Sequence, residues 1–106
     1  MTLLSRSEEL VLLAIWKLKD LAYGVPIRDL LSEWTEHEWA IGTIYKPLKQ
    51  LTLKALVIKT MTEPSAERGG RSKYIYSLTP KGEEALREIR KIQSAAWDSI
   101  EGELSI

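Results

Sequence analysis

Apolar side chains recur at helical spacing through the first half of the chain. The segment from about Ser5 to Lys19 places Ser5 and Glu8 at the spacing of a capping box, ahead of an apolar run from Leu10 to Trp16. A helix that covers a single core needs only an apolar stripe, so the remaining apolar face of this segment must be buried elsewhere. A second subunit is the simplest candidate to cover it.

Two shorter helices are expected next, separated by an acidic and aromatic connection. The first of them begins near Pro26, which suits an opening turn because it has no N–H to satisfy, and ends near Trp34. Residues 33–39 (EWTEHEW) form the connection, which Trp34 and Trp39 are expected to brace. The next helix spans about residues 42–54, and its core positions follow at i, i+4 and i+7: Ile44, Leu48 and Leu51.

The hydrophobic period then changes from helical to alternating. Residues 57–62 and 74–79 are predicted to be short strands, and the stretch between them, 63–73 (EPSAERGGRSK), is too polar to pack. Strand, basic loop and strand together indicate a β-hairpin with an extended tip. A last helix follows over about residues 80–102, with Thr79 as its N-cap.

The order of these elements predicts a mainly α chain with a small β-hairpin (α+β). The second and third helices have the layout of a helix-turn-helix, and the hairpin behind them is placed as a wing. We therefore expect a winged helix-turn-helix domain over residues 1–79 and a C-terminal dimerisation helix over residues 80–106, as one continuous domain.

The net charge is zero, but the charges are unevenly distributed. Residues 41–79 hold seven of the 15 Lys and Arg residues and only two of the 15 acidic residues, so a basic middle lies between two acidic flanks. Because binding to nucleic acid depends on local positive charge that meets phosphate, a neutral total is compatible with a DNA partner.

The sequence carries little of the chemistry that catalysis or metal binding needs. It has no cysteine, which excludes a disulfide framework and a thiolate zinc site, and one histidine. His37 lies between Glu36 and Glu38, but adjacent side chains rarely point at one ion. No glycine motif for phosphate binding is present. We therefore expect neither an enzyme nor a metal or other cofactor.

A membrane location is not expected either. No apolar run approaches the roughly 18–20 residues of a membrane span. The first residues also lack the pattern of a signal peptide, because acidic residues interrupt the charge and the apolar run. We therefore expect a cytoplasmic protein without a membrane partner.

Four short motifs follow one another along the chain. They are EELVLLAI (Glu8–Ile15), AYGxxI (Ala22–Ile27), GTIYxxLKxL (Gly42–Leu51) and ERGGRxKYxYxLTPxG (Glu67–Gly82). In this order and spacing they resemble the PadR family of bacterial and archaeal transcription regulators. The single helix after the wing is similar to the short-tailed branch of that family.

The resemblance implies a transcription regulator that binds a palindromic operator as a two-fold dimer, in most members as a repressor. The third helix would enter the major groove, and the wing would touch the DNA backbone or the minor groove. Tyr45 either packs or gives its hydroxyl to a phosphate. The residues expected at the DNA are Thr43, Tyr45, Lys46, Lys49 and Gln50 in the helix and Arg68, Gly69, Gly70, Arg71 and Lys73 in the wing.

The resemblance also implies that the last helix, with help from the first, forms the dimer. Some family members release DNA when a small molecule binds, and one branch stacks flat aromatic ligands on a tryptophan near the position of Gln93. Trp97 is therefore either dimer packing or a platform for a small planar aromatic effector. The residues assigned to the dimer or effector surface are Trp16, Leu86, Ile89, Ile92, Gln93, Ala96, Trp97 and Ile100.

The chain departs from the family pattern at two places. Lys46 stands where members commonly have proline, and Pro47 follows, so we expect the third helix to start at Thr43 or later. Ala55 stands where members usually have glycine, so we expect the exit turn to differ.

The alternative function is a winged-helix protein–protein adaptor without operator binding, which the neutral total charge and acidic flanks favour.

Overall fold

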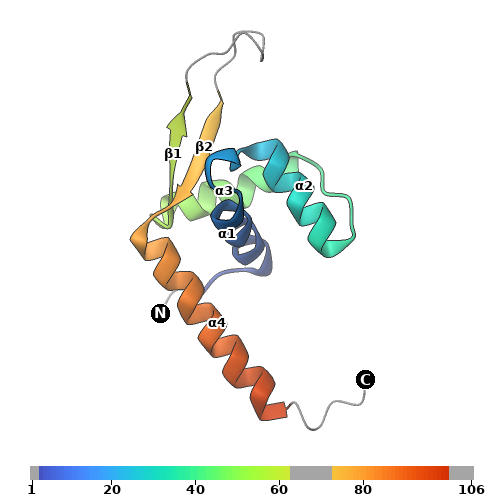
Figure 1. Cartoon of the computed structure of the whole chain (residues 1–106), viewed down its shortest axis with the longest axis vertical. Helices are drawn as coiled ribbons and strands as arrows, with labels where there is room; N and C mark the ends of the chain where they lie inside the picture. The colour runs from blue at the N-terminus through green and yellow to red at the C-terminus, as the bar shows by residue number, and fades with distance from the viewer. Residues whose placement is uncertain (1–2, 63–72, 101–106) are drawn as a thin grey trace.

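Helices and a hairpin surround one apolar core in the computed structural model, which describes residues 3–62 and 73–100 (Figure 1). The elements differ from the predicted bounds by no more than two residues, and they confirm the mainly α fold with a small hairpin. In chain order they are α1 (Arg6–Leu18), the short 3-10 helix η1 (Lys19–Leu21), α2 (Gly24–Thr35), α3 (Gly42–Leu53), β1 (Val57–Met61), β2 (Tyr74–Leu78) and α4 (Pro80–Ile100).

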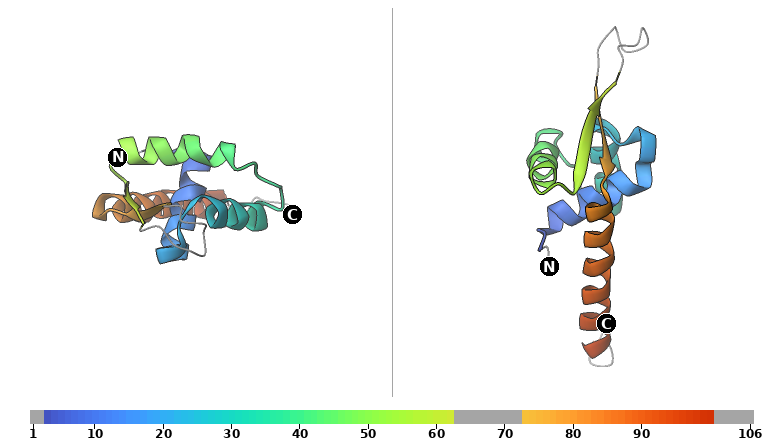
Figure 2. Two further views of the ribbon diagram at one scale, coloured as in Figure 1. Left: turned by 90° about the horizontal axis from the view of Figure 1, so that it is seen from above. Right: turned by 90° about the vertical axis from the view of Figure 1, so that its left-hand side faces the viewer.

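Helix α1 lies at the centre of the fold and contacts α2, α3, β2 and α4 (Figure 2). It begins with the predicted capping box. Ser5 Oγ accepts a hydrogen bond from the Glu8 N–H at 3.2 Å, and Glu8 Oε1 accepts one from the Ser5 N–H at 2.8 Å. Its inner face is buried at Val11, Leu12, Ala14 and Ile15.

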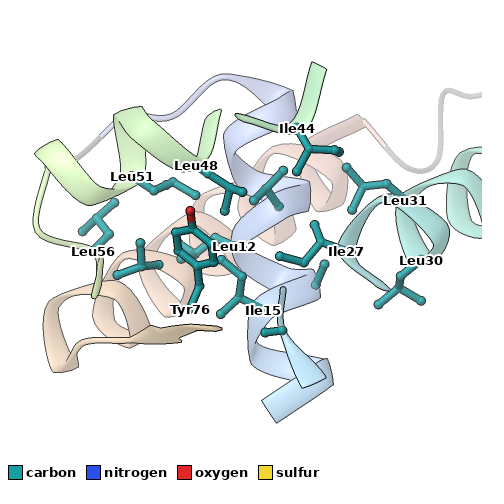
Figure 3. Packing of buried hydrophobic residues seen from close by; sticks show 14 of the residues in the cluster. Leu12, Ile15, Ile27, Leu30, Leu31, Ile44, Leu48, Leu51, Leu56 and Tyr76 are labelled. Atoms are coloured by element: carbon teal, nitrogen blue, oxygen red, sulfur yellow. The ribbon is translucent and has the colours of Figure 1, made fainter. Parts of the chain in front are cut away.

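The core takes side chains from every helix and from both strands (Figure 3). Each fully buried leucine or isoleucine stabilises the fold by about 1.5–3 kcal/mol relative to exposure. The largest fully buried side chains of α2, α3 and the segment that follows α3 are Ile27, Leu31, Ile44, Leu48, Leu51, Leu56 and Val57. Because α3 buries this one face, its opposite face is turned to solvent.

Helix α3 begins earlier than its proline suggests, which corrects the expected start at Thr43 or later. The helix starts at Gly42, and the buried Pro47 lies in its second turn. Bonds from the preceding turn hold the start of the helix: the Thr43 N–H bonds the Ala40 carbonyl at 3.0 Å, and the Ile44 N–H bonds the Ile41 carbonyl at 3.2 Å. Burial of the Pro47 ring in the core offsets the hydrogen bond that its nitrogen cannot donate.

The exit from α3 keeps the left-handed turn, so the expectation that Ala55 would change it is wrong. Ala55 has φ 60°, a conformation that glycine adopts without strain. The Leu56 N–H bonds the Leu51 carbonyl and the Ala55 N–H bonds the Thr52 carbonyl, both at 3.0 Å. These are the two hydrogen bonds of a Schellman motif, and they hold the turn in spite of the alanine side chain.

The hairpin and the start of α4 are joined to this turn. Thr79 Oγ1 donates to the Ala55 carbonyl at 2.7 Å and accepts from the Gly82 N–H at 3.0 Å, which confirms Thr79 as the N-cap of α4. A Cβ atom on Gly82 would lie 2.1 Å from the Leu56 carbonyl oxygen. Only glycine therefore allows α4 to start this close to the end of α3.

Helix α4 has two parts with different surroundings. Ala85 and Leu86 are each 5% exposed and belong to the core, so Leu86 does not lie on the free face where we expected it. The helix then leaves the body of the molecule (Figure 2), and every residue from 91 to 100 is exposed.

No helix within residues 3–62 and 73–100 is long and apolar enough to cross a membrane.

One ion pair joins α1 to α3. Lys54 Nζ lies 2.7 Å from Glu8 Oε2, and the Glu8 side chain is 10% exposed. Burial raises the pKa of Glu8, but the hydrogen bonds from Lys54 and Ser5 together outweigh burial and hold that pKa below its ordinary value. The charged form of Glu8 therefore stabilises the contact between the two helices.

We expect Ala55→Gly to raise the free energy of unfolding. A left-handed conformation costs an L-residue about 1–2 kcal/mol, whereas glycine costs about 0.5–1 kcal/mol of backbone entropy on folding. The expected gain is roughly 0.5–1 kcal/mol in urea denaturation. Ala95→Gly in the right-handed, exposed part of α4 is the control and should lower stability; a loss at both positions would contradict the assigned strain.

We expect Glu8→Gln to lower the free energy of unfolding by about 1–2 kcal/mol at pH 7. Because the folded-state pKa is depressed, the stabilisation is present above the unfolded value, about 4.3, and is lost as the pH falls through the folded value. Urea denaturation from pH 7 to pH 3 should therefore bring the two proteins together. Glu33→Gln removes an exposed charge and should match the parent throughout; a pH-independent loss in Glu8→Gln would contradict the ion pair.

Candidate nucleic-acid interface

Helix α3 carries the half of the DNA-assigned residues that the sequence placed in a helix, and its outer face presents the two lysines among them. Lys46 and Lys49 are exposed, and Gln50 is half-buried beside them. Leu53, 70% exposed, ends this face and was not among the predicted site residues. Among the described residues, no carboxylate lies within 4.0 Å of Lys46 or Lys49. The two ammonium groups are therefore available to an external anion.

The connection between α2 and α3 fixes the direction of this face. Trp39 Nε1 donates to Thr35 Oγ1 at 2.9 Å, and the Trp39 N–H donates to Ser32 Oγ at 3.1 Å. Thr35 Oγ1 in turn donates to the Leu31 carbonyl at 2.8 Å. Trp39 thus braces the connection as predicted. Trp34 does not, because it is 40% exposed and lines a groove against α1.

Thr43 is exposed at the first turn of α3, but its hydroxyl proton is already used. Thr43 Oγ1 donates to the Ala40 carbonyl at 2.6 Å. A hydroxyl has one proton, so this contact must break before Thr43 can donate to a phosphate. A groove of about 1260 Å³ runs beside Thr43, between α3 and the start of α1, and Arg6, Lys46 and Gln50 also line it.

Tyr45 lies between α3 and the start of α2. Its hydroxyl oxygen is 3.1 Å from the position that a Cβ atom on Gly24 would take, so glycine provides the room for it. The side chain is still 54% exposed. Tyr45 therefore packs with its hydroxyl end against the start of α2 while much of its side chain stays exposed, and its use toward a phosphate stays a prediction.

A backbone hydrogen bond and a cation–π contact, both made by Lys73, hold the base of the wing. Lys73 Nζ lies 3.4 Å from the centroid of the Tyr23 ring, and the Thr62 N–H donates to the Lys73 carbonyl at 2.8 Å. The Lys73 ammonium is therefore stacked on its own chain. The other predicted wing residues, Arg68, Gly69, Gly70 and Arg71, lie outside the described residues.

Sequence reasoning missed Lys59 and Tyr74. Lys59 Nζ lies 4.6 Å from the centroid of the Tyr74 ring. In the antiparallel register Lys59 is opposite Tyr76, so their side chains are on the same face of the hairpin. The alternating pattern of residues 57–62 contained the signal, because it puts Lys59 in phase with the buried Val57.

A second exposed surface runs along α4 and the outside of α1. Ile92, Ala96, Trp97 and Ile100 are exposed on α4, and Ile89 is half-buried. Gln93 Nε2 donates to Glu9 Oε2 of α1 at 3.1 Å. An almost wholly apolar groove of about 640 Å³ opens on the outside of α1, lined by Leu10, Leu13, Trp16, Lys17, Lys19 and Trp34. Among the predicted dimer residues of α4, Leu86 packs in the core with α1, Gln93 bonds Glu9 of α1, and Ile92, Ala96, Trp97 and Ile100 lie exposed.

Comparison with known proteins agrees with this geometry. The chain matches the Transcriptional regulator PadR-like family over residues 12–88. It is similar to a Streptococcus transcriptional regulator, with 27% identity and a TM-score of 0.72 over 90% of this chain and 88% of that one. A PadR family regulator from Clostridium difficile is 28% identical, with a TM-score of 0.63 over 92% and 93% of the two chains.

A PadR-like regulator from Bacillus cereus shares the fold, with 22% identity and a TM-score of 0.73 over 90% of this chain and 87% of that one. No curated protein matches the chain. The family match covers well over half of the sequence. The protein therefore belongs to the PadR-like family of transcriptional regulators, whose members bind DNA and are not enzymes.

Proposed function

We propose that the protein is a cytoplasmic homodimeric repressor that binds a palindromic operator. The observation that carries the proposal is a pair of exposed ammonium groups on the outer face of α3, Lys46 and Lys49, which have no carboxylate partner among the described residues. A dimer would present two copies of this face about one turn of DNA (~34–36 Å) apart. Repression needs only that the bound dimer occupies DNA that the transcription machinery must use.

The dimer part of the proposal rests on apolar surfaces whose exposure to water costs free energy. The free part of α4 exposes Ile92, Trp97 and Ile100 on one face, with exposed fractions of 45%, 56% and 45%. Each such side chain contributes about 1.5–3 kcal/mol when it is fully buried. The apolar groove outside α1 offers a second surface of the same kind. A two-fold dimer would bury the apolar face of α4 and the α1 groove in both subunits.

A small planar aromatic effector is the finer part of the proposal. The Trp97 ring is more than half exposed on α4, so it can stack on a flat ligand as well as on a second subunit. The test is quenching of tryptophan fluorescence by planar aromatic cations. An unchanged signal in the parent protein, or equal quenching in Trp97→Leu, would remove this part of the proposal.

We expect specific retention of the DNA upstream of the protein's own gene in a gel shift with excess competitor DNA. Binding should weaken steeply with salt, because each phosphate contact releases counterions with a slope of about −0.9. Lys49→Ala should weaken the complex at least about tenfold. Lys91→Ala, which removes an exposed charge from α4, is the control. Absence of specific retention at any salt concentration would instead favour the protein–protein adaptor.

We expect Ile92→Asp to shift the protein from dimer to monomer in sedimentation velocity. A carboxylate in an apolar seam loses its hydration without a partner, which costs several kcal/mol. The matched control is Ser94→Asp, which adds the same charge to an exposed position of the same helix. Circular dichroism should be unchanged in both, because position 92 lies outside the monomer core. A dimer that survives Ile92→Asp would contradict this seam.

A further inference from the structure

Three side chains that the DNA assignment leaves partly or wholly unused lie in the corner between α3 and the hairpin. They are Tyr45, Lys59 and Tyr74, and we call them the α3–hairpin corner. The register pairs Lys59 with Tyr76 and Met61 with Tyr74. The side chains of these two pairs share one face of the hairpin. Tyr76 points from that face into the core beneath α3 (Figure 3). Lys59 and Tyr74 therefore lie on the side of the hairpin that faces α3.

Tyr45 reaches the same corner from α3. The Tyr76 N–H of β2 donates to the Ala22 carbonyl at 2.8 Å, two residues before the Gly24 beside which the Tyr45 hydroxyl lies. The pKa of Tyr76 is raised, first by burial and then by Tyr45 and Tyr74, in agreement with this arrangement. The Tyr45 hydroxyl is also held against Gly24 at the start of α2. Tyr45 of α3 and Tyr74 of β2 thus belong to elements that meet at residues 22–24.

Lys59 adds a positive charge whose position is restrained. Its ammonium lies 4.6 Å from the Tyr74 ring centroid, and such a contact stabilises an exposed lysine conformation by about 0.5–1 kcal/mol. Within residues 3–62 and 73–100, no carboxylate lies within 4.0 Å of Lys59. The Tyr74 ring therefore restrains the long side chain, and no described carboxylate neutralises its charge.

We propose that the α3–hairpin corner binds one phosphodiester group of the DNA backbone in each subunit. The Lys59 ammonium supplies the charge, and the Tyr45 and Tyr74 hydroxyls donate hydrogen bonds to the non-bridging oxygens. The inference rests on the proposed operator binding, because α3 in the major groove and the hairpin on the flanking DNA leave a backbone strand to cross the corner between them. A singly charged group with several acceptor oxygens fits one cation and two neutral donors.

The experiment separates the two kinds of donor by their salt dependence. Operator affinity is measured by fluorescence anisotropy from 50 to 200 mM salt for the parent dimer, Lys59→Gln, Tyr74→Phe and the control Lys91→Gln. Lys59→Gln should reduce the slope of log K against log salt by about 0.9 per subunit, or about 1.8 per dimer. Over this fourfold range its affinity should then fall about tenfold less than that of the parent.

Tyr74→Phe keeps the ring under Lys59 but removes a neutral donor. It should weaken binding severalfold at every salt concentration and leave the slope unchanged, because a hydroxyl releases no counterion. Lys91→Gln should keep both slope and affinity. If the parent binds its operator and Lys59→Gln keeps the parental slope, this inference is contradicted and the proposed function is not. If the parent shows no specific binding, the proposed function fails and this inference with it.

Discussion

The structure depends on the burial of one helix that is apolar on nearly all sides. The inner face of α1 contacts α2, α3, β2 and α4, so these elements share one core and none of them has a separate one. The outer face, with Leu13 42% exposed, has no comparable cover among the described residues. The same helix thus holds the monomer together and presents an apolar surface that the proposed dimer would bury, so a change in α1 would affect both folding and association.

The charged side chains have two separate uses: some form ion pairs within the fold, and others are left for the proposed DNA ligand. The partly buried Glu8 binds Lys54 and so links α1 to α3. On the faces proposed for DNA, Lys46, Lys49 and Lys59 have no such partner among the described residues, and Lys59 and Lys73 are supported by aromatic rings instead. A ring restrains an ammonium group without cancelling its charge. A chain with no net charge can in this way present a basic face.

Periodicity and caps predicted the elements well, because each signal is local. The capping box at Ser5 and the N-cap at Thr79 are read from a few neighbouring residues and were confirmed. The failures involve burial and contacts that the local sequence does not show. Pro47 lies buried inside α3, and the left-handed turn at Ala55 is held by the two Schellman bonds together with the bond from Thr79 to the Ala55 carbonyl. Leu86 has the spacing of the free face of α4, but it lies where that helix still touches the body. The alternation of residues 57–62 already put Lys59 on the inner face of its strand, but its position beside Tyr74 needed the strand register.

The tight junction at Gly82 gives α4 a mechanical property. Its first turn is fixed to the end of α3 by the Thr79 bonds and by the approach to the Leu56 carbonyl. A helix of 21 residues is about 31 Å long, so it acts as a stiff arm. A rotation of about 5° at the far end would move the junction by almost 3 Å on that length. In the proposed dimer, small rearrangements along α4 would therefore change the separation of the two winged-helix units.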